Sequence, residues 1–156
     1  MLIFSLPDET ATLEIGAAIA PLLRVGDVVA LHGGLGAGKT TLTRGVLQAL
    51  CGEVEVPSPT YTLVQTYETP DFLLWHFDLY RLETPEDLQE LAWDETADGV
   101  AIVEWPDRAG EQLPKWRLDI RFAMEETGRT VTLEPHGEDW QKRLNGDSFK
   151  FPRRRD

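Results

Sequence analysis

A glycine-rich bend between an apolar run and a helical pattern constrains the fold most strongly. Residues 28–41 read Val-Val-Ala-Leu-His-Gly-Gly-Leu-Gly-Ala-Gly-Lys-Thr-Thr. Four residues in this stretch have the spacing G-x-x-x-x-G-K-[ST] of a phosphate loop, which joins a buried strand to a helix. They are Gly33, Gly38, Lys39 and Thr40. The pattern predicts an α/β fold, a single P-loop NTPase-like domain with a mixed, mostly parallel β-sheet flanked by helices.

The residue types in this loop suit the binding of a polyphosphate. Glycines let successive backbone N–H groups turn toward an anion without a clashing Cβ atom, and the following helix adds unsatisfied N–H groups and the positive end of its dipole. We expect Lys39 to reach the β- and γ-phosphates and the Thr40 hydroxyl to ligate Mg²⁺. The predicted nucleotide-binding residues of the loop are Gly34, Leu35, Gly36, Ala37, Gly38, Lys39, Thr40 and Thr41.

Length and composition limit the other possibilities. A chain of 156 residues is long enough for one domain with a hydrophobic core. The net charge of −12 argues against autonomous binding of nucleic acid, which depends on clustered Lys and Arg. Cys51 is the single cysteine, so no intrachain disulfide can form, and no stretch approaches the ~18 apolar residues of a membrane span. We expect a cytoplasmic protein that does not insert into a membrane.

Hydrophobic periodicity predicts the order of the elements. Strands are expected at residues 2–6, as an edge strand, and at 28–31, 63–67, 72–78 and 100–103, with a C-terminal β-hairpin at 118–124 and 129–134. Helices are expected at 9–23 after an Asp8 N-cap, at 39–50, from Thr84 to about Leu91, and near Trp140. Prolines make residues 56–61 a stiff loop that presents Ser58 and Thr60. The domain is expected to span residues 1–145, followed by a flexible basic tail at 146–156.

Two acids follow buried strands and are the candidates for chemistry. Asp78 ends the apolar run 72–77, and Glu104 ends the run 100–103. Ligands of open α/β sheets bind beyond the carboxyl ends of the strands, so both acids should lie near the phosphate loop. An acid there can hold Mg²⁺ directly, hold its water shell or orient an attacking water, and the sequence does not rank the two. Capping of a following turn is the alternative for each acid.

The sequence constrains the type of nucleotide enzyme, GTPase, ATPase or kinase, less than it constrains the fold. The Asn-Lys-x-Asp element with which GTPases usually bind guanine is absent. A self-contained kinase of a small metabolite is the enzymatic alternative to an ATPase, with Arg108, Arg117 and Arg121 as phosphate clamps or as solvated surface charges. The acidic segment 82–98 is most simply a solvated face, with binding of a basic partner as the alternative.

The histidines and Trp105 are weaker candidates for the site than the two acids. His32, His76 and His136 lack the spacing of metal ligands and are expected to be structural. Trp105, directly after Glu104, either packs over the nucleotide or a partner or belongs to the core.

Several stretches together resemble one family. They are Leu35-Gly-Ala-Gly-Lys-Thr-Thr, Ser58-Pro-Thr-Tyr-Thr-Leu-Val, His76-Phe-Asp-Leu-Tyr-Arg-Leu and Val103-Glu-Trp-Pro. The chain is similar to the TsaE (YjeE) family over roughly residues 8–134, and the Ser-Pro-Thr and Asp-Leu-Tyr-Arg elements discriminate far better than a phosphate loop alone. The resemblance implies an ATPase subunit of the bacterial machinery that forms threonylcarbamoyladenosine at position 37 of tRNA. The implied protein partners are TsaB and TsaD, and tRNA would be contacted only through them.

The resemblance also implies roles for individual residues. The implied cofactors are ATP and Mg²⁺, with Lys39 and Thr40 at the phosphates and the metal. Glu104 would ligate or position the metal, Asp78 would support hydrolysis, and Thr60 would lie in a switch-like loop. Residues that match more loosely, at positions flanking the base and ribose, are Glu9, Thr10 and Arg129. The family usually has an acid where this chain has Gly34, so no role of that acid carries over.

Overall fold

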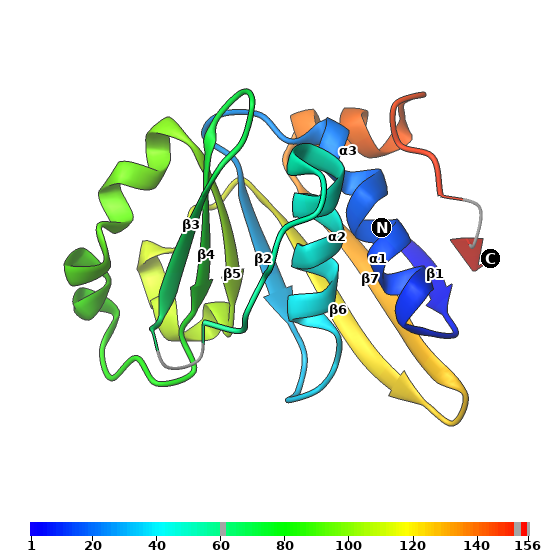
Figure 1. Ribbon diagram of the computed structural model, residues 1–156, viewed down its shortest axis with the longest axis horizontal. Coiled ribbons are helices and arrows are strands. Elements are labelled where there is room, and N and C mark those ends of the chain that lie inside the picture. The colour runs from blue at the N-terminus through cyan, green and yellow to red at the C-terminus, as the bar shows by residue number, and fades with distance from the viewer. Residues whose placement is uncertain (60–61, 152–153, 156) are drawn as a thin grey trace.

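The computed structural model describes residues 1–59, 62–151 and 154–155. Its described strands form one eight-stranded sheet in the spatial order β3-β4-β5-β2-β6-β7-β1-β8 (Figure 1). The strands are β1 (Leu2–Leu6), β2 (Val28–His32), β3 (Val64–Glu68), β4 (Leu73–Asp78), β5 (Val100–Glu104), β6 (Arg117–Glu125), β7 (Gly128–His136) and β8 (Arg154–Arg155). The α-helices are α1 (Glu9–Ile19), α2 (Lys39–Cys51) and α3 (Glu138–Asn145), and the 3₁₀ helices are η1 (Ala20–Leu22), η2 (Pro85–Leu91), η3 (Trp93–Asp98) and η4 (Pro106–Gln112).

The sheet is parallel in its centre and antiparallel on both sides. Strands β4, β5, β2 and β6 run parallel, whereas β3, β7, β1 and β8 pair antiparallel with their neighbours. The predicted α/β fold with a mixed sheet and a C-terminal hairpin is therefore confirmed. The hairpin is longer than predicted because backbone pairing continues to Glu125 and Gly128, past the alternating side chains. The expected edge strand β1 is not the outermost described strand, because β8 pairs along its other side.

The first helix begins where the sequence predicts and ends earlier. The Asp8 carboxylate accepts a hydrogen bond from the Ala11 N–H at 2.8 Å, which confirms the predicted N-cap. The predicted extent to Leu23 is wrong: α1 ends at Ile19 and continues as the 3₁₀ turn η1. Pro21 explains the difference, because it has no N–H to donate and its ring clashes with the preceding turn of an α-helix.

The predicted helix after Thr84 is a 3₁₀ helix. Its start is as expected, with a capping box in which the Thr84 N–H donates to the Asp87 carboxylate at 3.2 Å. The helix then stops at Ala92, which has a left-handed backbone at φ 60°, and restarts as η3. Composition alone does not separate a 3₁₀ helix from a short α-helix, because both use the same caps and first-turn residues.

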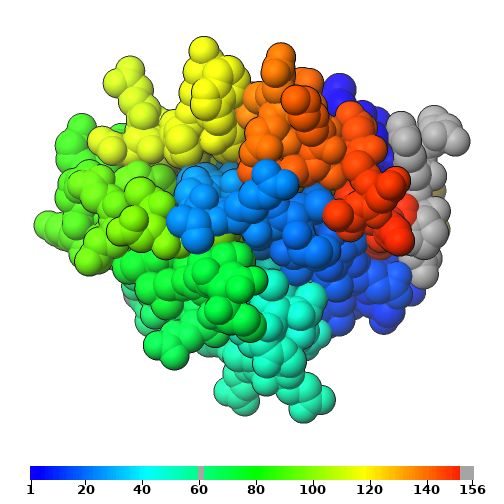
Figure 2. Space-filling view, turned by 90° about the horizontal axis from the view of Figure 1, so that it is seen from above, coloured from blue at the N-terminus to red at the C-terminus, as the bar shows by residue number. Residues whose placement is uncertain are grey.

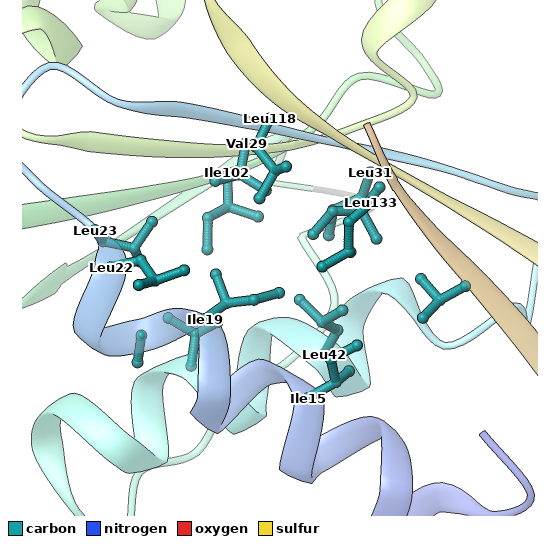
Figure 3. Packing of buried hydrophobic residues seen from close by; sticks show 14 of the residues in the cluster. Ile15, Ile19, Leu22, Leu23, Val29, Leu31, Leu42, Ile102, Leu118 and Leu133 are labelled. Atoms are coloured by element: carbon teal, nitrogen blue, oxygen red, sulfur yellow. The ribbon is translucent and has the colours of Figure 1, made fainter. Parts of the chain in front are cut away.

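Two hydrophobic layers cover opposite faces of the sheet. Helices α1 and α2 cover one face, where Ile15, Ile19 and Leu42 pack toward Val29 and Leu31 of β2 (Figure 3). On the other face, the second cluster draws on β4 and β5 together with η2, η3 and η4. Its buried residues include Phe77, Leu88, Trp93, Val103 and Ala109. The strands that carry the predicted acids are thus buried between two layers, which fixes their carboxyl ends in place.

Helices α1 and α2 cross in very close contact. A Cβ atom on Gly45 would lie 2.2 Å from the Leu13 carbonyl oxygen, and one on Gly16 would lie 2.2 Å from the Leu42 carbonyl oxygen. Both distances are shorter than any tolerable contact to backbone. Only glycine at these two positions lets the helices approach so closely, and this approach holds the start of α2 against the sheet.

We predict that Gly45→Ala destabilises the fold. The new methyl group must push α1 away from α2, and overpacking of this kind costs about 1–3 kcal/mol in the free energy of unfolding. Urea unfolding followed by circular dichroism measures the change. Gly34→Ala is the matched control, because a Cβ there meets no atom within 4 Å, and its effect should stay within about 0.5 kcal/mol. Equal stabilities of Gly45→Ala and wild type would contradict the tight crossing.

Helix α3 closes the end of the molecule opposite the glycine-rich loop. Figure 2 shows it in orange against the blue segment that precedes β2. The buried Arg143 guanidinium donates to both carboxylate oxygens of Asp27, at 2.6 and 3.0 Å, and to the Leu22 carbonyl at 2.9 Å. This ion pair ties α3 to the start of β2.

The residues after α3 return to β1. The rings of Phe149 and Phe151 pack edge-on against Phe4, with centroid distances of 5.8 and 5.2 Å. The flexibility expected for residues 146–156 and the boundary at residue 145 stay predictions. In the part of the chain that the structure describes, no helix is both long enough and apolar enough to cross a bilayer.

Candidate nucleotide-binding site

The site lies where β2, β4 and β5 end and α2 begins, at the lower edge of the view in Figure 1. Gly38 is the N-cap of α2 with φ 111°, a backbone conformation that residues with a side chain rarely adopt. A Cβ there would also approach the Phe122 ring at 3.4 Å. The N-cap Gly38 has no side chain that could cap this helix start, so the first N–H groups of α2 face the loop and are available to an anion.

A cavity of about 250 Å³ opens beside this helix start. Its lining comes from the loop, the two strand ends, α1 and the hairpin. The lining residues are Glu9, Leu35, Gly36, Ala37, Gly38, Lys39, Thr40, Thr41, Ser58, Asp78, Glu104, Trp105 and Arg129. Most of the predicted nucleotide-binding and catalytic residues are thus brought together. Gly34 and Thr10 do not line this cavity, and Thr60 lies outside the described residues.

The Lys39 side chain crosses the loop from the start of α2. Its ammonium Nζ donates to the Gly33 carbonyl at 2.8 Å and lies 4.0 Å from the centre of the Trp105 ring. Burial lowers the pKa of Lys39 below its ordinary value, and the charges of Glu104 and Asp78 act in the opposite direction. The ammonium is therefore already held inside the loop and faces both acids.

The two candidate acids are neighbours on adjacent parallel strands. Asp78 and Glu104 are register partners at the carboxyl ends of β4 and β5, and their exposed fractions are 3% and 4%. Asp78 accepts a hydrogen bond from the Tyr80 N–H at 3.0 Å, so it caps the following turn as well as lining the cavity. The prediction from the strand ends, that both acids lie beside the loop, therefore agrees with the structure.

Glu104 binds the side chain of Thr40, the second residue of α2. Its Oε2 atom accepts a hydrogen bond from the Thr40 hydroxyl at 2.9 Å. Magnesium prefers oxygen ligands and takes only one or two from the protein when it binds with phosphates. The Thr40 and Glu104 oxygens, adjacent in a cavity lined by backbone amides, fit that requirement.

His76 is the site residue that the sequence interpretation missed. Its Nε2 atom lies 2.6 Å from Glu104 Oε2, and its side chain is fully buried. The expectation that this histidine is only structural did not include a contact with the site. The available signal was the two-residue spacing from Asp78, which places both side chains on the same face of β4.

The other two histidines lie on the opposite face of the sheet around Asp119. His32 and His136 approach the carboxylate of Asp119 at 3.0 and 2.7 Å, and Arg117 donates to it at 2.9 and 3.1 Å. Although burial alone would raise the pKa of Asp119, the hydrogen bonds from His32 and Arg117 hold it below its usual range. These histidines contribute to a polar network around the buried Asp119 carboxylate, and this network is separate from the cavity.

Arg129 reaches the loop from the hairpin. Its guanidinium donates to the Gly36 carbonyl at 2.8 Å, so one end of β7 is tied to the phosphate loop. Glu9 also lines the cavity and lies 3.7 Å from Arg44. Trp105, with a left-handed backbone at φ 57°, covers Lys39, and its ring packs at a tilt of 51° against Tyr80 with the centroids 4.9 Å apart. Its ring thus forms a wall of the cavity.

The arginines of the kinase alternative lie elsewhere. Arg117 and Arg121 bind acids on the face of the sheet away from α2, namely Asp119 and Glu134. Arg108 lies 6.0 Å from the Tyr80 ring and does not line the described cavity. The phosphate clamps that a small-molecule kinase would use are therefore not assembled from these residues.

Comparison with known proteins gives consistent matches. The model of the family "Threonylcarbamoyl adenosine biosynthesis protein TsaE" matches residues 6–131. The tRNA threonylcarbamoyladenosine biosynthesis protein TsaE of Rickettsia felis is 40% identical over 104 residues, which cover 65% of this chain and 61% of that relative, less than two thirds of its length. The protein of the same name from Haemophilus influenzae is 36% identical over 135 residues, 82% of this chain and 85% of the relative. A crystal structure of Bacillus subtilis YdiB has a TM-score of 0.78 at 30% identity and covers 92% of this chain and 90% of its own.

Proposed function

This chain belongs to the TsaE family, and from that premise we propose that it is the ATP-binding and ATP-hydrolysing subunit required to form the threonylcarbamoyl group on adenosine 37 of tRNA. Its relatives are named for tRNA threonylcarbamoyladenosine biosynthesis. The observation that carries the proposal is the arrangement of Lys39, Thr40 and Glu104 around the glycine-rich loop. The partners in the proposal are TsaB and TsaD.

The loop and Lys39 bind the phosphates in this proposal. The free N–H groups at the start of α2 donate to phosphate oxygens, and Lys39 leaves the neutral Gly33 carbonyl for a charged phosphate. Charge-assisted hydrogen bonds are the stronger ones, so this exchange favours the bound state. Thr40 and Glu104 hold Mg²⁺, which neutralises charge on the β- and γ-phosphate oxygens when it is bound.

Asp78 supports the hydrolytic step. It lies beside Glu104 at the same sheet end, is buried, and lines the cavity. A carboxylate in this place orients the attacking water toward the γ-phosphate and accepts its hydrogen bond. In this proposal the two acids have different roles: Glu104 binds the metal, and Asp78 orients the attacking water.

An ATPase assay with and without the TsaB–TsaD complex tests the proposal. We expect Mg²⁺-dependent release of phosphate from ATP that rises when the complex is added, with no phosphoryl acceptor present. A chain that phosphorylates a metabolite at full rate alone would instead support the kinase alternative. A chain that binds ATP and never hydrolyses it, with or without partners, would be a nucleotide-dependent scaffold.

We predict that the nucleotide state controls partner binding. Ser58 lines the cavity, and the resemblance to the TsaE family implies that Thr60, which lies outside the described residues, belongs to a switch-like loop that responds to the γ-phosphate. Affinity for the TsaB–TsaD complex should then differ about 5- to 150-fold between a non-hydrolysable ATP analogue and ADP. Surface-immobilised complex and the two nucleotides measure this difference.

Thr60→Ala should narrow the difference without abolishing nucleotide binding, because it removes a hydroxyl from the switch-like loop and leaves the phosphate loop intact. Thr62→Ala, two residues further along the chain, is the control. Equal partner affinities with the ATP analogue and with ADP would contradict nucleotide control, since a ligand shifts an equilibrium only through differential affinity.

A further inference from the structure

The fully buried His76 contacts Glu104, one of the two residues proposed to hold Mg²⁺. His76 on β4 is a register partner of Ile102, two residues before the pair Asp78 and Glu104. Its side chain is on the same side of the sheet as Asp78, beneath the start of α2. Its Nε2 atom is 2.6 Å from Glu104 Oε2, the same oxygen that accepts from Thr40 at 2.9 Å.

The hydrogen-bond roles follow from the chemistry of the carboxylate. An ionised carboxylate has acceptors only, so the imidazole Nε2–H of His76 donates to Glu104. The other ring nitrogen, Nδ1, is also a polar atom. In the part of the chain that the structure describes, this buried atom has no hydrogen-bond partner. A buried unsatisfied polar atom destabilises a fold, and an apolar side chain of similar shape would avoid that cost. Stability alone therefore does not explain a histidine here.

Lys39 is an alternative partner of the Glu104 carboxylate inside the cavity, in place of Thr40 and His76. Burial lowers the pKa of Lys39 while the Glu104 charge acts in the opposite direction, so the two groups lie within electrostatic reach. Without the bond from His76, the Glu104 carboxylate would keep, among the described residues, only its hydrogen bond from Thr40, and it would be freer to turn toward Lys39. That ion pair would occupy both the residue needed for the phosphates and the residue needed for the metal.

We propose that His76 is a positioning residue that holds Glu104 Oε2 against the Thr40 hydroxyl, so that the metal end of the nucleotide site is assembled before nucleotide binds. This inference rests on the proposed function of the site. Residues that orient a metal ligand commonly change metal affinity or activity 10- to 100-fold when replaced. His76 should therefore affect the Mg²⁺ requirement of the site more than its intrinsic affinity for nucleotide.

The test is calorimetric binding of a non-hydrolysable ATP analogue at a series of Mg²⁺ concentrations and in EDTA. In His76→Leu, the Mg²⁺ concentration that gives half-maximal tightening should rise about 10- to 100-fold, while the affinity in EDTA stays near that of wild type. His76→Gln, whose amide can still donate to Oε2, should recover most of the Mg²⁺ response. His136→Leu is the matched control, because it removes a histidine from a different buried carboxylate, Asp119, and should leave the response unchanged.

Several outcomes would overturn the inference. A folded His76→Leu variant with the wild-type Mg²⁺ response would do so, as would equal losses in His76→Leu and His76→Gln with and without Mg²⁺. If His76→Leu does not fold, His76→Asn replaces it, because its shorter amide does not reach Oε2. Asn and Gln variants with the same Mg²⁺ response would then refute positioning, and a weaker response in the Asn variant alone would support it. If wild type itself shows no Mg²⁺-dependent binding, the proposed function fails, which is a separate result.

Discussion

Glu104→Gln is expected to slow ATP hydrolysis by at least about a hundredfold, while the affinity for nucleotide without Mg²⁺ changes little. The substitution keeps the size of the side chain and removes the negative charge that faces Thr40 and the cavity. We expect the loss of this charged metal ligand to raise the free energy of the transition state more than that of bound ATP. Single-turnover hydrolysis, with a separate titration of nucleotide, measures the two effects independently.

Asp78→Asn should show the same pattern through the attacking water. The control for both variants is Glu111→Gln, which changes an exposed acid of η4 outside the cavity in the same way. Wild-type single-turnover rates in the Glu104 and Asp78 variants would mean that the two acids only cap their turns. A loss of binding equal to the loss of rate would mean that they act on the ground state.

Lys39→Ala is expected to weaken binding of MgATP and MgADP roughly ten- to hundredfold. The lost charge-assisted contact with the phosphates contributes about 1.5–3 kcal/mol. The fold should persist, because the contacts of the lysine ammonium with the Gly33 carbonyl and the face of Trp105 belong to the loop and the cavity wall, and the hydrophobic clusters on the two faces of the sheet do not depend on them. Calorimetric titration measures the affinity, and circular dichroism checks the fold.

Lys115→Ala provides the control for that variant. Lys115 is an exposed lysine whose ammonium lies 4.7 Å from the centre of the Trp116 ring, and it does not line the cavity. Its removal changes the net charge by the same amount as Lys39→Ala, so general electrostatic effects cancel in the comparison. Unchanged nucleotide affinity in Lys39→Ala would contradict the phosphate-loop assignment itself.

The parts of the fold that follow from local sequence patterns were predictable. The glycine-rich loop, its strand and its helix come from one contiguous stretch, and the structure has β2 and α2 where that stretch predicts them. Asp78 and Glu104 follow apolar runs, so their place at the carboxyl end of the sheet could be inferred without knowing the strand order. The N-cap Asp8 of α1 could also be predicted from local sequence, since a capping side chain binds a backbone N–H within three residues.

The parts that depend on distant contacts were not predictable from one sequence. His76 and Glu104 are 28 residues apart, and Arg143 and Asp27 are 116 apart. Nothing in the local sequence of either partner indicates the other, because the pairing depends on which strands and helices become neighbours. The 3₁₀ form of η2 and η3 was missed for a different reason, since caps and first-turn residues of this kind also suit a short α-helix.

Arg129 was predictable in part, since its element followed from the sequence and its contact did not. Its position in a hairpin was predictable from the alternating side chains on either side of the turn, and resemblance to the TsaE family indicated a loose link to the nucleotide. Its hydrogen bond to the Gly36 carbonyl required the order β2-β6-β7, which brings the hairpin beside the phosphate loop. The sequence therefore predicted its element, and the structure supplied its contact.

Formation of threonylcarbamoyladenosine on tRNA in a reconstituted reaction shows whether ATP hydrolysis by this chain is required for the modification. Purified TsaB–TsaD complex, the threonylcarbamoyl donor, tRNA and ATP are combined with wild-type chain, with Glu104→Gln or with Glu111→Gln, and the modified nucleoside is quantified over repeated turnovers. We expect sustained modification with wild type and with Glu111→Gln, accompanied by ATP hydrolysis, and little with Glu104→Gln. Sustained modification at the wild-type rate with Glu104→Gln, or without the chain, would contradict this requirement.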